Sequence, residues 1–342
     1  MDFDSTIDRR DTSCMKWDFM EEIFGVSPEE GLAMWVADTD FKVPPPVIAK
    51  MHEMADHGIY GYVNCDSAYK GAISWWMQNR HGWEVEPGAI FTTTGLVNGV
   101  GMCLDTFTQP GDGIVLFTPV YHAFSKVIRN AGREVVECQL VNNEGRYEMD
   151  MAAYDAQMTG KEKMVILCSP HNPGGRVWTQ EELQSVADFA KRHDLYLLSD
   201  EIHHDLVFDG ATHIPMQNAA PEITDRLLML TAPSKTFNFA GLHTGQVIIP
   251  DPHLREQFQR RMLALALSPN SATTADAADR SGTPAAMRAA TASRRSPSIS
   301  RTTSRRRRPE ATTARSSDPT RSAMGSAAGI ASILPRLGWG PS

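Results

Sequence analysis

The chain has 342 residues, of which 42% are hydrophobic and 22% charged, and its formal net charge is −8. This length allows a large core in one or two domains, and the composition is that of a globular protein. No apolar run approaches the roughly 18 residues of a membrane-spanning helix, so we expect no membrane association. The N-terminus is polar and unlike a secretory signal, and the five scattered cysteines form no CxxC pair. We therefore expect a cytoplasmic protein with reduced thiols, without disulfides or a metal site.

The charge is unevenly distributed along the chain. Residues 269–342 contain 12 arginines, no lysine and four acidic residues, a net charge of +8, whereas the rest of the chain carries −16. Ala, Ser, Thr, Pro and Arg dominate this tail, which lacks the apolar surface needed to offset the entropy of ordering, so we predict that it is disordered. Its abrupt start after Ser271 favours the hypothesis of a reading-frame shift, which translation of the other two frames would test.

Residues 1–265 have the pattern of a folded α/β protein. Strands are predicted at 89–92, 113–117, 163–168, 195–199 and 227–231, and helices at 95–107 and 179–193. Thr179 and Glu182 have the spacing of a capping box at the start of the second helix. Because the strands are continuously apolar and helices separate them, we predict a mainly parallel sheet covered by helices on both faces. Such sheets bind ligands at the carboxyl ends of their strands.

Two charged residues lie at predicted strand ends. Asp200 closes one apolar run, and Lys235 follows another, directly after Ser234. A lysine that can form a Schiff base and a carboxylate that can pair with a pyridinium nitrogen are what pyridoxal 5′-phosphate (PLP) chemistry requires. A lone lysine in such a string is more commonly a solvated surface residue, so this interpretation depends on its surroundings.

Three further segments end at the same predicted edge. Gly95 opens a helix whose N-terminal N–H groups can bind a phosphate, although a simple strand–helix turn explains it equally well. Tyr121 can stack on a flat ring or serve as a core residue. The loop 169–175, Ser-Pro-His-Asn-Pro-Gly-Gly, is more specific. Its prolines and glycines restrict the backbone around Asn172, whose amide can donate to a phenolate oxygen.

These motifs together resemble a known family. The loop 169–175, Ser-Asp-Glu-Ile-His at 199–203 and Ser-Lys-Thr-Phe-Asn at 234–238 resemble the fold-type I, class I/II aminotransferase superfamily. Within it, Trp-Val-Ala-Asp-Thr-Asp-Phe at 35–41 and Tyr-Gly-Tyr at 60–62 resemble the cystathionine β-lyase (MalY/PatB-type) branch. The resemblance implies three regions: an N-terminal arm and small-domain segment at 1–45, a large PLP-binding domain at 46–268, and a tail at 269–342 where family members have a C-terminal small domain.

The resemblance also implies a role for each site residue. Lys235 would form the Schiff base with PLP and then move the Cα proton, Asp200 would keep the pyridine nitrogen protonated, and Tyr121 would stack on the ring. Residues 35–38 would line the substrate entrance. The remaining implied cofactor contacts come from Asn172 and His203 at the ring, from Gly95, Leu96 and Ser234 at the phosphate, and from Tyr62 of the partner subunit in a homodimer.

The implied activity is α,β-elimination from cystathionine or a related cysteine conjugate, which yields a thiol, pyruvate and ammonia. Three alternatives to this activity are left open: transamination, a catalytically inactive PLP-binding remnant, and a regulatory protein with this fold. Family members bind the substrate carboxylate through an arginine in a Phe-Leu-Arg-Phe-Asn-like string, and its absence here predicts impaired turnover. The arginine-rich tail raises nucleic-acid binding as a rival, but no aromatic residues are interleaved for base stacking, so we do not expect a nucleic-acid partner.

Overall fold

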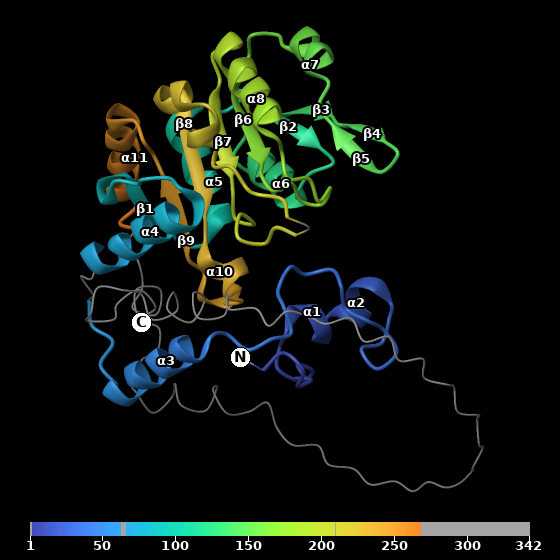
Figure 1. Ribbon diagram of the computed structural model, residues 1–342, viewed down its shortest axis with the longest axis vertical. Coiled ribbons are helices and arrows are strands. Elements are labelled where there is room, and N and C mark those ends of the chain that lie inside the picture. The colour runs from blue at the N-terminus through green and yellow to red at the C-terminus, as the bar shows by residue number, and fades with distance from the viewer. Residues whose placement is uncertain (1, 63–65, 209, 268–342) are drawn as a thin grey trace, which may run out of the picture. The chain divides into compact units, whose positions relative to one another are not determined.

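The computed structural model of the chain describes residues 2–62, 66–208 and 210–267 (Figure 1). These residues all fall within one compact unit, Met1–Arg295. The predicted tail at 269–342 and its proposed origin in a frameshift lie outside the described residues, and the predicted domain boundaries stay predictions. Within the described part of the chain, no helix combines the length and apolar character that crossing a membrane requires.

Helices and strands alternate along most of the chain. The α-helices are α1 (Met15–Asp18), α2 (Met20–Phe24), α3 (Pro45–His57), α4 (Asp66–His81), α5 (Leu96–Phe107), α6 (His122–Asn130), α7 (Met151–Gln157), α8 (Gln180–Arg192), α9 (Met216–Ala219), α10 (Pro233–Thr236) and α11 (Pro252–Ala264). The strands are β1 (Ile90–Thr93), β2 (Gly113–Thr118), β3 (Glu134–Gln139), β4 (Val141–Asn143), β5 (Arg146–Glu148), β6 (Glu162–Cys168), β7 (Tyr196–Asp200), β8 (Leu227–Thr231) and β9 (Gly245–Ile248). The five predicted strands are thus confirmed as β1, β2, β6, β7 and β8, and the two predicted helices as α5 and α8.

A seven-stranded sheet forms the centre of the fold, in the order β1-β9-β8-β7-β6-β2-β3. The five strands from β8 to β3 pair in parallel, whereas β9 pairs antiparallel with both β8 and β1. The prediction of a mainly parallel sheet is therefore confirmed. The hairpin β4–β5 is a separate two-stranded sheet that the sequence analysis did not predict.

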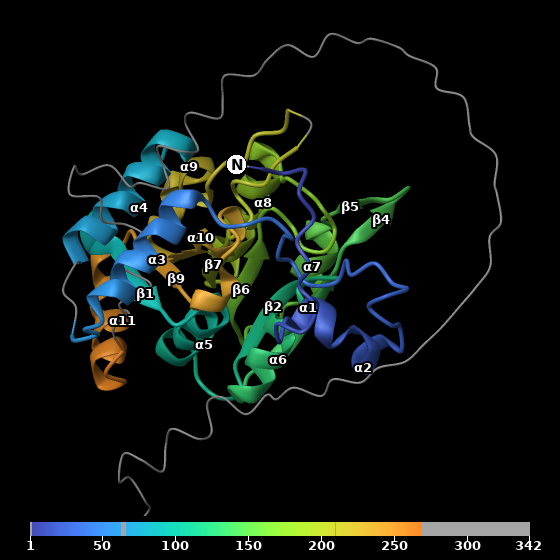
Figure 2. The same ribbon diagram turned by 90° about the horizontal axis from the view of Figure 1, so that it is seen from below.

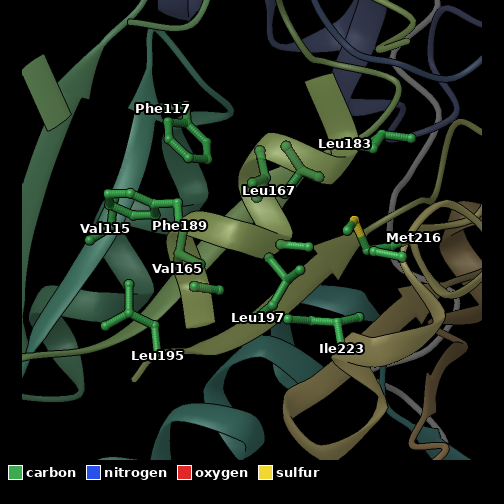
Figure 3. Close-up of a cluster of buried hydrophobic side chains, with 14 of the residues drawn as sticks. Val115, Phe117, Val165, Leu167, Leu183, Phe189, Leu195, Leu197, Met216 and Ile223 are labelled. Carbon is green, nitrogen blue, oxygen red and sulfur yellow. The ribbon is translucent and has the colours of Figure 1, made fainter. Parts of the chain in front are cut away.

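Both faces of the sheet are buried, which explains why its strands are apolar without alternation. Successive residues of a strand point to opposite faces. Val115 and Phe117 pack on one face with residues of α8, while Ile114 and Leu116 pack on the other with residues of α5, α6 and α11. Figure 3 shows part of the first cluster, and Figure 2 shows α8 and α9 on one side of the sheet and α5 and α6 on the other. Burying each such side chain contributes about 1.5–3 kcal/mol.

The start of α8 confirms the predicted capping box. Thr179 Oγ1 accepts a hydrogen bond from Glu182 N at 3.3 Å, and Glu182 Oε2 accepts one from Thr179 N at 2.8 Å. The same carboxylate also binds Arg176 through both oxygens, at 2.5 and 2.6 Å. The helix start is therefore tied to the loop that precedes it.

Candidate functional site

The candidate site lies where four neighbouring strands end. The strands β8, β7, β6 and β2 are adjacent and parallel, so their carboxyl ends share one edge of the sheet. Tyr121 follows β2, the loop 169–175 follows β6, Asp200 ends β7 and Lys235 follows β8. The structure therefore brings the chemically informative segments of the sequence to a single edge, as predicted.

Asp200 is a buried carboxylate with little hydrogen bonding. It is 4% exposed, and its Oδ1 accepts a hydrogen bond from Ile202 N at 3.1 Å. Among the described residues, its Oδ2 accepts none. Burial raises the pKa of Asp200 to about 7, against the opposing effect of the Ile202 N–H, and the neighbouring charge of Glu201 raises it further. Such a group favours a cationic N–H partner.

Lys235 lies on α10, the short helix after β8, and is partly buried. Its Nζ donates a hydrogen bond to the carbonyl oxygen of Ala37 at 2.7 Å. Burial lowers the pKa of Lys235, and the charges of Asp38 and Asp200 offset part of this effect. A lysine with a lowered pKa more readily presents the neutral amine that acts as nucleophile and base.

Tyr121 lies at the N-terminus of α6 and is half-buried. Its ring packs edge-on against Phe124, with ring centroids 5.6 Å apart. Burial raises the pKa of Tyr121, and the charge of Asp200 raises it further, as expected for neighbours at one edge. The stacking role that the resemblance implies for Tyr121 stays a prediction.

The loop 169–175 is held rigidly around Asn172. His171 is 3% exposed, its Nε2 lies 2.8 Å from the carbonyl oxygen of Pro119, and its ring meets Trp178 edge-on at 5.4 Å. A Cβ at Gly174 would lie 2.9 Å from the His171 ring, so a larger residue there would displace that ring. The side-chain amide of Asn172 donates to no other group among the described residues, which leaves it available to a ligand.

The N-terminus of α5 has the geometry of an anion site. Gly95 is its N-cap, with φ 80°, and no side chain caps the helix. Gly245 on β9 approaches closely: a Cβ there would lie 2.8 Å from Gly95 C and 2.9 Å from Leu96 N. Helix-terminal N–H groups that no side chain occupies can bind phosphate. Ser234, 8% exposed, is the other predicted phosphate contact.

His203 and Tyr62 differ in their surroundings. His203 is partly buried, and burial lowers its pKa to about 4, with a further contribution from the charge of Lys235. Tyr62 is fully exposed and adjoins residues 63–65, outside the described part of the chain. Its expected contact concerns a partner subunit and stays a prediction.

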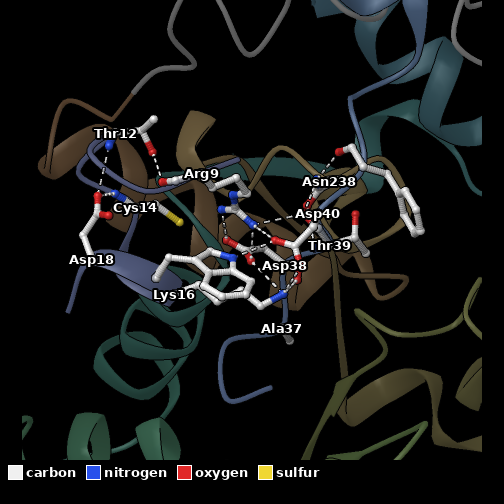
Figure 4. Close-up of polar contacts among 12 residues, drawn as sticks. Arg9, Thr12, Cys14, Lys16, Asp18, Ala37, Asp38, Thr39, Asp40 and Asn238 are labelled. Carbon is white, nitrogen blue, oxygen red and sulfur yellow. Dashed lines mark hydrogen bonds and ion pairs between the residues drawn. The ribbon is translucent and has the colours of Figure 1, made fainter. Parts of the chain in front are cut away.

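The segment 37–41, which we call the strap, contacts the turn that carries Lys235. Asn238 Nδ2 donates to the carbonyl oxygens of Thr39 and Phe41 at 2.9 and 2.7 Å, and its Oδ1 accepts from Thr39 N at 2.9 Å (Figure 4). Together with the bond from Lys235 to Ala37, these contacts place the strap against the turn. The resemblance implies that residues 35–38 line the substrate entrance, but the contact of Asn238 with this segment was not predicted, although Asn238 lies in the same string as Lys235.

The strap is held from the other side by cations of the N-terminal segment. Arg9 binds Asp38 at 2.9 Å and Asp40 at 2.8 Å, and Lys16 binds Asp40 at 2.8 Å. Partial burial opposes the ionisation of Asp40, but hydrogen bonds from Lys16, Trp17 and Arg9 outweigh it and lower its pKa to about 2. Asp40 therefore carries its charge near neutral pH.

The chain matches a protein-family model and is similar to several known proteins. The family model for aminotransferase class I and II matches residues 35–303. Cystathionine beta-lyase PatB of Bacillus subtilis (strain 168) is 39% identical over 259 residues, which is 75% of this chain and 66% of the relative. Protein MalY of Escherichia coli (strain K12) is 31% identical over 259 residues, 75% of this chain and 65% of the relative. The chain thus spans just under two thirds of the length of these relatives.

Solved structures show the same similarity. Cystalysin from Treponema denticola, which contains a pyridoxal 5′-phosphate cofactor, has a TM-score of 0.74 and 36% identity, covering 80% of this chain and 70% of that one. The PLP-bound C-S lyase from Staphylococcus hominis has a TM-score of 0.74 and 31% identity, covering 82% of this chain and 72% of that one.

Proposed function

Because the chain belongs to the class I and II aminotransferase family, we propose that it binds PLP and catalyses β-elimination from an amino acid with a sulfur leaving group. One observation carries the proposal: Lys235, whose pKa is lowered, lies at the same sheet edge as Asp200, whose pKa is raised. The similarity to proteins named cystathionine beta-lyase and C-S lyase supports the choice of reaction.

The residues present fit this cofactor at three points. The buried Asp200 carboxylate has an oxygen without a donor among the described residues and suits a protonated pyridine nitrogen. The uncapped N-terminus of α5 at Gly95 suits a phosphate. The Lys235 amine, with its lowered pKa, suits covalent attachment to an aldehyde.

When bound, PLP supplies an electron sink that stabilises negative charge at the Cα atom of an amino acid. The chain's own residues then have separate roles. Asp200 would hold the proton on the pyridine nitrogen, and Lys235 would remove the proton from Cα. Tyr121 would stack on the ring and Asn172 would donate to its oxygen substituent. Loss of the Cα proton would allow the Cβ–S bond to break, with its electron pair leaving on sulfur as a thiolate, and water would then hydrolyse the remaining three-carbon enamine to pyruvate and ammonia.

We further propose that cystathionine is a substrate, that the protein forms a homodimer, and that Tyr62 of the partner subunit contacts the phosphate. The proposed phosphate contacts within the chain are Gly95, Leu96 and Ser234, with His203 near the ring. Transamination is the second candidate reaction, since it begins with the same loss of the Cα proton. The products distinguish them, because only elimination from cystathionine releases pyruvate.

The test is the visible absorbance of the purified chain on addition of PLP, followed by pyruvate release from cystathionine. We expect absorbance with the wild type and with the control Lys161→Ala, whose side chain is exposed, and its loss with Lys235→Ala. Equal absorbance with Lys235→Ala would overturn the proposed attachment site. Cofactor binding through Lys235 without pyruvate release would overturn the lyase activity and leave a transaminase or an inactive remnant.

A further inference from the structure

Next to the candidate site lies a buried group of three imidazoles and two carboxylates, which we call the histidine–carboxylate cluster. It comprises His81 on α4, Glu201, His204 and Asp205 after β7, and His213 before α9. The shortest contacts are 2.8 Å between His213 Nε2 and Glu201 Oε2, and 2.9 Å between His81 Nε2 and Asp205 Oδ1. All five side chains are 6% exposed or less. The proposed reaction uses none of them.

Hydrogen bonds account for every carboxylate oxygen of the cluster. Asp205 accepts from Trp76 Nε1 at 3.1 and 3.0 Å, from His81 at 2.9 Å and from Thr236 Oγ1 at 2.7 Å. Glu201 accepts from Ser199, Met216 N and His213, at 2.8, 3.0 and 2.8 Å. Two sets of three cluster atoms lie within 4.8 Å of one another, a spacing that a metal ion could bridge. A cation would have to displace these donors, so we interpret the cluster as a hydrogen-bond network.

Asp205 joins two segments that are far apart in sequence. Trp76 and His81 belong to α4, whereas Thr236 is the residue directly after Lys235. Phe237 adds a second contact to the same helix, because its ring meets that of Trp76 edge-on at 5.3 Å. Two consecutive residues after Lys235 are therefore anchored to α4, one through Asp205 and one through an aromatic contact.

We propose that Asp205 is a positioning residue, which fixes the Lys235 turn against α4 through the hydroxyl of Thr236 and so sets where the Lys235 amine stands relative to Asp200. The importance of that placement rests on the proposed function. Asp205 touches no reacting atom in this arrangement; it acts through Thr236. The strap contacts the turn from Asn238 and Lys235, so Asp205 and the strap hold different atoms of one turn.

The sharpest test compares Thr236→Val with Thr236→Ser. Valine keeps the branched shape but has no hydroxyl, whereas serine keeps the donor to Asp205. We expect Thr236→Val to lower kcat for pyruvate release roughly tenfold or more with KM little changed, since a misplacement of about 1 Å can cost about 100-fold. We also expect the pH midpoint of the cofactor's visible absorbance to shift in Thr236→Val. In Thr236→Ser, kcat and this midpoint should both stay close to the wild-type values. Asp205→Asn should resemble Thr236→Val.

A readout without the cofactor separates this proposal from the proposed function. In the cofactor-free protein, an amine-modifying reagent followed by mass spectrometry gives the rate at which Lys235 is labelled, with the exposed Lys161 as internal reference. We expect faster labelling of Lys235 in Thr236→Val than in the wild type or Thr236→Ser. Faster labelling with no visible absorbance in the wild type would support the positioning role and overturn the PLP proposal.

Two results would overturn the positioning role. One is a folded Thr236→Val protein with wild-type labelling, kcat and absorbance midpoint. The other is stoichiometric zinc in the purified wild-type protein that is lost in His204→Ala, because a bound ion would replace the hydrogen bonds on which the argument depends. Thr236→Val keeps the test valid if Asp205→Asn fails to fold.

Discussion

The turn that carries Lys235 is held on two sides by different kinds of contact. On the inner side, Asp205 and Trp76 are 4% and 7% exposed and bind the turn through a buried charge and an aromatic ring. On the outer side, the strap uses main-chain carbonyls, and its aspartates are 21% and 38% exposed. A hydrogen bond to a charged group contributes about 1.5–3 kcal/mol, whereas an ordinary hydrogen bond contributes about 0.5–1.5 kcal/mol. We therefore expect the inner contacts to hold the Lys235 turn more strongly, in agreement with the proposed positioning role, and the outer contacts to open at smaller cost.

The largest effect is expected from Asp200→Asn, because the inner side is proposed to set the position of Lys235 relative to Asp200. An amide of the same shape cannot hold the proton on the pyridine nitrogen, and loss of one member of a buried pair costs roughly 3–5 kcal/mol, or about 10²–10⁴ in rate. We expect pyruvate release to fall by that factor while visible absorbance through Lys235 persists. Asp188→Asn, a change to an exposed carboxylate on α8, should have no effect. Activity near that of the wild type in Asp200→Asn would remove Asp200 from the proposed mechanism.

The burial of Asp200 should be visible in how the free energy of unfolding of the cofactor-free protein depends on pH. The pKa of Asp200 is about 7 when folded and 3.8 ordinarily. Between these values the folded protein holds a proton that the unfolded chain has released, so this group's contribution to the free energy of unfolding falls as the pH rises towards 7 and is constant above it. His203, with a pKa of about 4, acts in the opposite direction.

The comparison with Asp200→Asn separates these two contributions. The variant keeps the contribution of His203 and loses that of Asp200. At pH 7.5, we expect denaturant unfolding to show that the cofactor-free variant is more stable than the wild type by a few kcal/mol, because each unit of pKa shift corresponds to about 1.4 kcal/mol. This difference in the free energy of unfolding should shrink towards pH 5. A difference that is the same at both pH values would show that Asp200 does not titrate in this range.

A smaller effect is expected where β9 meets α5. A methyl group in Gly245→Ala would lie 2.8 Å from Gly95 C and 2.9 Å from Leu96 N, against backbone that cannot yield easily. Such overpacking costs about 1–3 kcal/mol, and it also displaces the N–H groups of the proposed phosphate site. We expect a lower midpoint of urea unfolding and weaker PLP binding by titration. The matched control is Gly241→Ala, which meets no atom within 4 Å. Equal behaviour of the two variants would contradict the close approach.

Part of this site can be predicted from the sequence, because neighbouring parallel strands place their carboxyl ends at one edge of the sheet. Once the apolar runs are assigned as parallel strands, Tyr121, Asn172, Asp200 and Lys235 must gather at one edge, and the structure places them there. The strand bounds differ from the predicted ones by at most one residue, because pairing with the neighbouring strand decides where each strand ends.

The remaining contacts depend on approaches between distant parts of the chain. Lys235 and Ala37 are 198 residues apart, and Trp76 and Asp205 are 129 apart. Nothing in the spacing of these residues predicts that they meet. Gly245 is similar, since its need for glycine comes from the backbone of Gly95 on another element. Asp205 had one signal in the sequence, a carboxylate after two histidines close to Asp200, but its partners on α4 were not deducible.

The smallest expected effect concerns the outer side of the turn. Asn238→Ala removes three hydrogen bonds to the strap, which lie at the protein surface where water can replace them. We expect the strap to open about 1 kcal/mol more easily, or roughly fivefold more often, with the midpoint of global unfolding nearly unchanged. Trypsin cleavage after the exposed Lys42, which adjoins the strap, should accelerate by that factor.

Asn218→Ala is a matched control for this change, because Asn218 also donates to two main-chain carbonyls at the surface but away from the strap. Its cleavage after Lys42 should equal that of the wild type. If Asn238→Ala also leaves cleavage unchanged, the strap is held by Arg9 and Lys16 through its aspartates rather than by the turn. In that case Asn238 does not control the opening of the strap, although the hydrogen bond from Lys235 to Ala37 still joins the turn to it.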